Sequence, residues 1–157
     1  LVLGNNGPFS TAPLFSVKPG AKGDITLAKG AKSNEFVNWW RLRSGPGLSS
    51  PVIQGDYLYV SQDAFVNCYD VRTGERIYRE RLPQGGSVIA SLLIVGDRIF
   101  IQSEDGRGTF VKTGPTFEVV GTNKLDDVFW SSPAVAGDAL LLRGVDKLYC
   151  VRAAGNN

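Results

Sequence analysis

Few side chains in this sequence are of the types that usually carry chemistry. The 157 residues contain no histidine and two cysteines, Cys68 and Cys150. Histidine is the commonest general base and the commonest transition-metal ligand, and two cysteines alone do not make a zinc site. We therefore expect neither catalytic residues nor a metal site.

The remaining candidates are charged and aromatic side chains beside predicted turns: Arg43, Asp63, Glu104, Asp105 and Trp130. Acidic and basic groups facing one another across the mouth of a channel would hold a small polar ligand or a peptide. Loops on a rigid scaffold are where binding residues concentrate. The simpler interpretation is that these residues are ordinary polar turns. A ligand site requires a fold that brings the five positions to one rim.

A repeat of 41 residues organises the chain and would supply that fold. It is clearest in SSPVIQGDYLYV (49–60), ASLLIVGDRIFI (90–101) and SSPAVAGDALLL (131–142). The same step relates Ser50, Ser91 and Ser132, then Cys68, Thr109 and Cys150, then Tyr69, Phe110 and Val151. A fixed period near 40 residues indicates a repeat architecture.

Each period contains short β-rich runs separated by turn residues. Gly-Asp between two apolar runs predicts a hairpin with a type II′ turn. Thr73-Gly74 and Thr113-Gly114 close a third run, and a fourth follows at 76–82 and at 117–122. Four strands per period with no helical periodicity predict one β-propeller blade per repeat.

Both faces of these strands are apolar. Leu58 and Val60 alternate with Tyr59, and the following repeats keep the pattern. A blade stacked between two neighbours buries both faces, whereas a sandwich leaves one face of each sheet wet. We therefore expect an all-β fold of four-stranded antiparallel propeller blades, about 3.5–4 in this chain. A seven-stranded sandwich is the structural alternative.

The chain divides into blades unevenly within a single β-propeller segment, residues 1–157. We expect a partial blade at 1–48, complete blades at 49–89 and 90–130, and an incomplete blade at 131–152. In the partial blade, 12–21 matches a third strand, and 23–40 an outer strand with an insertion. The last blade lacks its fourth strand, which we expect another part of the assembly to supply.

The segment NCYDVRTGERIYRERL (67–82) resembles the A-x-D-x-x-T-G-x-x-x-W signature of the PQQ-like (quinoprotein-type) β-propeller repeat, with Asp70, Thr73 and Gly74 matching. The inner strands resemble the same family, over about residues 8–152. The signature tryptophan, which docks between blades, is Tyr78 here. The family includes outer-membrane assembly lipoprotein propellers and exported bacterial proteins, so the resemblance implies an exported or periplasmic location in a bacterium.

The quinone-dependent dehydrogenases of this family imply a calcium-bound cofactor, a vicinal disulfide and a catalytic aspartate. This sequence has no adjacent cysteines and no visible calcium-ligand cluster. We therefore expect no cofactor, PQQ included. Cys68 and Cys150 would lie two blades apart, too far for a disulfide. We predict that both are buried free thiols.

Propellers of this family usually have six to eight blades, so this chain is roughly half of one. Half a propeller exposes two apolar blade faces, which are association sites. We expect a homodimer or a missing propeller half to cover them, rather than closure of four blades alone. The chain begins at Leu1 and contains no methionine or visible signal peptide, so we expect it to be part of a longer or processed polypeptide.

The net charge and the length of the apolar runs limit the classes of partner that we expect. The net charge is +2 and no apolar run is long enough to span a membrane, so we expect neither nucleic acid nor a membrane span. Residues 1–48 carry a local excess of positive charge, for which a solvated loop face is the simpler interpretation. Trp39-Trp40 and Phe129-Trp130 would form a partner platform or, more simply, fill gaps between blades.

These observations predict a non-enzymatic propeller scaffold that binds protein or a small ligand. A fragment of a PQQ-dependent quinoprotein oxidoreductase is one alternative. A scaffold like the outer-membrane assembly lipoproteins is another. The fold by itself does not choose among them.

Overall fold

The computed structural model describes residues 2–4 and 12–153, and every regular element among them is a β-strand. The strands form four antiparallel sheets in which each strand pairs with its neighbours in the sequence. The described residues contain no helix, and hence no candidate membrane-spanning helix.

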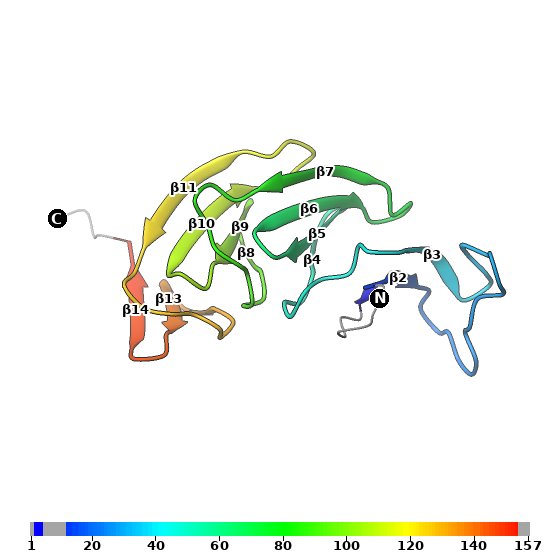
Figure 1. Ribbon diagram of the computed structural model, residues 1–157, viewed down its shortest axis with the longest axis horizontal. Coiled ribbons are helices and arrows are strands. Elements are labelled where there is room, and N and C mark those ends of the chain that lie inside the picture. The colour runs from blue at the N-terminus through cyan, green and yellow to red at the C-terminus, as the bar shows by residue number, and fades with distance from the viewer. Residues whose placement is uncertain (1, 5–11, 154–157) are drawn as a thin grey trace.

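We number the sheets as blades in chain order. Blade 1 contains β1 (Val2–Gly4), β2 (Leu14–Val17) and β3 (Val37–Arg41). Blade 2 contains β4 (Val52–Gln54), β5 (Tyr57–Gln62), β6 (Phe65–Asp70) and β7 (Arg76–Arg81). Blade 3 contains β8 (Leu93–Val95), β9 (Arg98–Gln102), β10 (Arg107–Lys112) and β11 (Val119–Lys124). Blade 4 contains β12 (Ala134–Ala136), β13 (Ala139–Arg143) and β14 (Leu148–Arg152). The blades follow one another along an arc (Figure 1).

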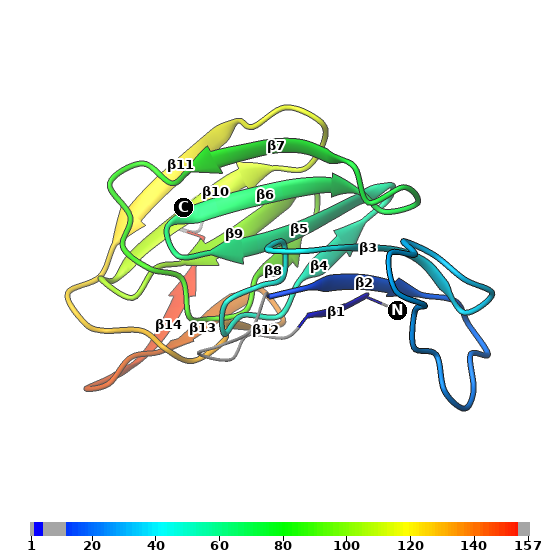
Figure 2. The same cartoon turned by 45° about the vertical axis from the view of Figure 1, so that its right-hand side comes forward.

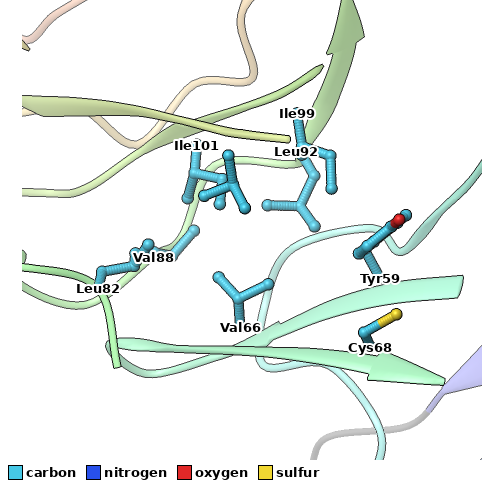
Figure 3. Packing of buried hydrophobic residues seen from close by; sticks show 9 residues of the cluster. Tyr59, Val66, Cys68, Leu82, Val88, Leu92, Ile99 and Ile101 are labelled. Atoms are coloured by element: carbon cyan, nitrogen blue, oxygen red, sulfur yellow. The ribbon is translucent and has the colours of Figure 1, made fainter. Parts of the chain in front are cut away.

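Successive blades pack face to face, as in a β-propeller. Between blades 2 and 3, Tyr59, Val66 and Cys68 meet Ile99 and Ile101 in a fully buried cluster (Figure 3). Figure 2 shows the two sheets side by side, with β5–β7 alongside β9–β11. Leu58 and Tyr69 face the other way, onto Leu14 and Trp39 of blade 1. Both faces of blade 2 are therefore buried, which confirms radial stacking over a sandwich.

The Gly-Asp hairpins have the predicted turn. Gly55, Gly96 and Gly137 have φ of +57°, +61° and +61°, whereas none of the following aspartates lies in the left-handed region. A positive φ at the first of the two central residues and not at the second is the pattern of the type II′ turn, whose twist matches the flanking strands. The sequence prediction is confirmed.

The recurring serine of the repeat has a structural role between blades. The Ser50 N–H donates to Ser91 Oγ at 3.0 Å, and the Ser91 N–H donates to Ser132 Oγ at 3.1 Å. Each hydroxyl thus accepts from the backbone of the blade before it. The serine therefore recurs at the 41-residue step because it ties blade 2 to blade 3 and blade 3 to blade 4 in the same way.

Trp39 fixes blade 1 against blade 2. Its indole Nε1–H donates to the Val71 carbonyl at 3.0 Å, and its ring lies flat against the turn that contains Gly74. A Cβ added to Gly74 would come within 2.5 Å of the indole ring. Gly74 is therefore required twice, for its φ of +70° and for the close approach of the ring.

The third strand of blade 3 departs from the 41-residue step. Tyr69 pairs with Leu58 and faces blade 1, but Phe110 pairs with Phe100 and faces blade 4. The β9–β10 loop is one residue longer than the β5–β6 loop, because Ser103 bonds to Arg107 and leaves three residues between them. A slip of one residue turns every side chain to the other face. The predicted equivalence of Cys68 with Thr109, and of Tyr69 with Phe110, is therefore wrong in orientation.

The prediction of two buried thiols is half right. Cys68 is buried and free, but Cys150 is free and exposed. Cys150 pairs with Leu141 on the face of blade 4 that points away from blade 3, where no described residue covers it. Burial at this position requires a following blade.

Asp127 fixes the chain where it enters blade 4. Its carboxylate accepts hydrogen bonds from the backbone N–H groups of Val128, Val145, Asp146 and Lys147, at 2.7–3.3 Å, and from the Tyr149 hydroxyl. Desolvation opposes ionisation, but these donors outweigh it and hold the pKa of Asp127 below its usual range. One carboxylate thus ties the β11–β12 linker to the β13–β14 turn.

We expect Gly74→Ala to destabilise the protein by about 3 kcal/mol or more, because it combines left-handed strain with a clash against Trp39. Gly55→Ala is the matched control: Gly55 has φ of +57° but no atom within 4 Å of an added Cβ. The control should lose only the backbone strain, about 1–2 kcal/mol. Urea unfolding measures both, and equal losses would contradict the close packing of Trp39.

We expect Asp127→Asn to lower stability at pH 7, because the substitution removes the charge that the backbone donors stabilise. The folded-state pKa is lowered, so the stabilisation is full above the ordinary value of 3.8 and is lost as the pH falls through the folded-state value. The difference from the wild type should therefore shrink at pH 3. Asp126→Asn, at the exposed neighbour, is the control. A difference that is unchanged with pH would contradict this account.

Candidate functional site

The candidate rim consists of the β5–β6, β9–β10 and β13–β14 loops and the linkers that enter each blade. The linker between blades 2 and 3 bonds to both neighbouring loops, since the Val88 N–H donates to the Asp63 carbonyl and the Glu104 N–H donates to the Ser87 carbonyl. The next linker does the same, from the Phe129 N–H to the Glu104 carbonyl and from the Val145 N–H to the Val128 carbonyl. The loops and linkers thus form one continuous backbone hydrogen-bonded rim.

Two of the five predicted site residues come together on this rim between blades 3 and 4, since the Trp130 Nε1–H donates to Glu104 Oε1 at 2.7 Å. Asp105 follows in the same loop, where its Oδ1 accepts from the Arg107 N–H at 3.3 Å, but its side chain lies beside Gly86 of the linker between blades 2 and 3. Phe129 is fully buried in the cluster with Phe100 and Leu142, whereas Trp130 is 56% exposed. The gap-filling interpretation therefore holds for Phe129 and is wrong for Trp130, whose ring lies on the surface.

The other two predicted site residues, Arg43 and Asp63, lie between blades 1 and 2. Both have left-handed backbone, with φ of +54° and +51°. Gln62 Nε2 donates to the carbonyls of Arg43 and Gly45, which holds the linker beside the β5–β6 loop. The structure thus does not bring the five candidates to one place. Among residues 12–153, no hydrogen bond or ion pair joins Arg43 or Asp63 directly to Glu104, Asp105 or Trp130.

The first pair of tryptophans is not part of the rim. Trp39 and Trp40 lie in β3, the outer strand of blade 1, with Trp39 buried against blade 2. Trp40 faces the opposite side, where its ring stacks on Phe15 with centroids 6.1 Å apart, and its Nε1–H donates to the Ala31 carbonyl. Trp39 therefore fills the gap between blades, as the simpler interpretation predicted.

The buried thiol and phenol groups between blades 2 and 3 are not activated as nucleophiles. Desolvation raises the pKa of Cys68 to about 12 and the pKa of Tyr59 to about 12, and it raises the pKa of Tyr78 as well. The Tyr59 hydroxyl accepts the Gly114 N–H at 2.7 Å, which ties blade 2 to the β10–β11 turn of blade 3. These groups are neutral at physiological pH and hold the blades together.

The donor set of the described residues does not fit a calcium-held quinone. No group of three or more His, Cys, Asp or Glu side chains among them is arranged to hold a metal ion. The two thiols are far from adjacent in the sequence, and only Cys68 is buried. We therefore derive no chemical step through that cofactor from these residues.

Two hollows were missed by the sequence analysis. The first, of about 750 Å³, lies under the β2–β3 connection and is lined mainly by apolar residues, including Phe15, Ile25, Leu27 and Trp40. The second, of about 610 Å³, is polar and is lined by Arg41, Arg43 and Arg76 with Leu42, Ser44 and Glu75. The second joins residues of two blades, so periodicity alone could not reveal it.

Comparison with solved structures gives β-propellers. The chain is similar to BamB from Moraxella catarrhalis, with 17% identity, a TM-score of 0.71, and coverage of 96% of this chain and 42% of that one. It is also similar to the quinohemoprotein alcohol dehydrogenase from Comamonas testosteroni, with 22% identity, a TM-score of 0.50, and coverage of 62% and 17%. A europium-containing methanol dehydrogenase matches with 18% identity, a TM-score of 0.50, and coverage of 60% and 20%.

No family model matches the sequence, and neither does any curated protein. The chain spans less than half the length of each solved structure above. At identities below 25% the likeness shows the fold and nothing finer. The chain is all-β and is built of β-propeller blades of the kind found in BamB and in these two dehydrogenases.

Proposed function

We propose that the chain is part of a non-enzymatic β-propeller scaffold that binds protein or small-ligand partners. Its loops and linkers form a continuous rim on a rigid set of blades, and the rim presents Glu104 and Trp130 together. Exposed aromatic side chains beside polar groups are frequent anchors of protein interfaces. The likeness to BamB over 96% of the chain supports this kind of role over the enzyme alternative.

The uncovered face of blade 4 is the observation that carries the scaffold proposal. Leu148 is 69% exposed, and Cys150 beside it is exposed as well. β14 has no outer strand among the described residues, whereas β6 and β10 each pair with one. Apolar sheet faces and open edges of this kind favour association. We propose that a second copy of the chain, or another segment of the natural protein, covers this end.

A more specific form of the proposal is a scaffold like the outer-membrane assembly lipoproteins, exported to the bacterial envelope. The likeness to BamB supports it. Fractionation of cells that express the full natural gene tests the location. Recovery in the envelope or periplasmic fraction supports this form, and recovery with cytoplasmic markers contradicts it.

The second candidate is a fragment of a PQQ-dependent oxidoreductase. Its support is the likeness to the quinohemoprotein and methanol dehydrogenases, over 60–62% of the chain. The donor set of the described residues speaks against it.

Thiol labelling combined with light scattering tests the covered end. If a second copy covers blade 4, the chain should have about twice its mass of 16.9 kDa, and Cys150 should react slowly. Cys68 is the internal control, because it is buried in either state. The proposal of a completed ring would be contradicted if Cys150 reacted as fast as it does in the unfolded protein. This rate would have to be found in both this chain and the full natural protein.

Titration with PQQ and Ca²⁺ separates the scaffold from the oxidoreductase. We expect no change in the cofactor's absorbance and no change in melting temperature, because no donor set for the pair is present in the described residues. A saturable spectral change together with a raised melting temperature would favour the enzyme alternative.

A further inference from the structure

Five arginines line the seam between blades 1 and 2, which we call the arginine seam: Arg41, Arg43, Arg76, Arg79 and Arg81. Arg41 ends β3 and pairs with Leu14, whose side chain faces blade 2. On β7, Arg76 pairs with Tyr69, which faces blade 1. The seam therefore unites arginines that lie far apart in the sequence.

The other arginines of β7 share this side of the sheet. Arg79 pairs with Asn67 and Arg81 with Phe65, and these partners alternate with Val66 and Cys68, which face blade 3. The Arg79 guanidinium lies 3.6 Å from the centre of the Phe65 ring. This contact holds one cation in place on the seam.

The centre of the seam is the polar hollow lined by Arg41, Arg43 and Arg76. None of these three guanidinium groups has a carboxylate within 4 Å in the described part of the chain, although Glu75 also lines the hollow. The exposed Arg72, Arg98 and Arg152, by contrast, each pair with an aspartate. Three cations in one hollow repel one another, and an anion placed among them would relieve that repulsion.

We propose that the arginine seam binds an acidic peptide segment of a partner protein. From Arg76 to Arg81 the row along β7 is about 17 Å long, at about 3.3 Å per residue. A single phosphate cannot span that row, whereas an extended run of Asp and Glu can. A guanidinium group donates two parallel hydrogen bonds to one carboxylate, which suits such a peptide.

A nucleic acid fits the seam less well. Binding of single strands uses exposed aromatic rings on which bases stack. On the seam, Phe65 is covered by Arg79, and Trp39 is buried between the blades. The proposal deepens the scaffold function and rests on it, because it names the chemistry of one partner.

Fluorescence anisotropy with a labelled Glu decapeptide tests the proposal on the full 157-residue chain. We expect the triple variant R41Q/R43Q/R76Q to bind the peptide at least about tenfold more weakly, because each lost guanidinium removes a charge-assisted contact. The matched control is R72Q/R98Q/R152Q, which removes the same charge from exposed arginines elsewhere and should change binding by less than about threefold. The triple variant with lysine at the seam positions should lie between, because it keeps the charge and loses the fork.

Three outcomes would overturn the arginine seam as the peptide site. The first is that the labelled peptide shows no saturable binding. The second is that R41Q/R43Q/R76Q and R72Q/R98Q/R152Q weaken peptide binding equally. The third is that a thymidine decanucleotide or inorganic phosphate displaces the labelled peptide at a lower concentration than unlabelled peptide does. The Trp130→Ala variant separates this failure from failure of the scaffold. Peptide binding lost in that variant and kept in the seam triple would reject the seam and leave a binding scaffold that uses its rim.

Discussion

The structure depends on the fact that the central sheets are apolar on both faces and must each pack between two neighbours. Blade 2 meets this requirement completely, with Leu58 and Tyr69 buried toward blade 1 and Tyr59 and Cys68 buried toward blade 3. Specific contacts then fix the relative position of the blades. The Trp39 indole rests on the Gly74 turn, the Tyr59 hydroxyl accepts a hydrogen bond from the Gly114 N–H, and the Ser91 and Ser132 hydroxyls join blades 2, 3 and 4.

The same requirement explains why the outward faces of blades 1 and 4 leave apolar side chains only partly covered. Phe15 and Trp40 face away from blade 2, and the β2–β3 connection forms only part of a cover over them. At the other end, Leu148 and Cys150 face solvent. A fold whose units need a neighbour on both sides makes its outermost faces into association surfaces, so the proposed scaffold role and the proposed cover over blade 4 have one physical origin.

The candidate site is distributed over several places because each linker meets the loops of the two blades that it joins. Glu104 and Trp130 meet where blades 3 and 4 join, Asp105 lies beside the linker between blades 2 and 3, and Arg43 and Asp63 lie where blades 1 and 2 join. Two of the basic residues that give residues 1–48 their excess positive charge, Arg41 and Arg43, lie beside Arg76 of β7 in the structure. β3 and β7 are successive outer strands, and their side chains combine into the arginine seam.

The sequence by itself determined the blade. Its 41-residue step, the Gly-Asp turns and the alternation of apolar residues depend on local backbone geometry and strand period, which neighbouring residues encode. It also placed the loops that form the rim. Only the tertiary structure decided the orientation of Phe110, because one extra residue in the β9–β10 loop reversed the faces of that strand. Only the tertiary structure decided the exposure of Cys150 and Trp130 and the meeting of Arg43 with Arg76, because burial and convergence depend on which blade lies next to each side chain.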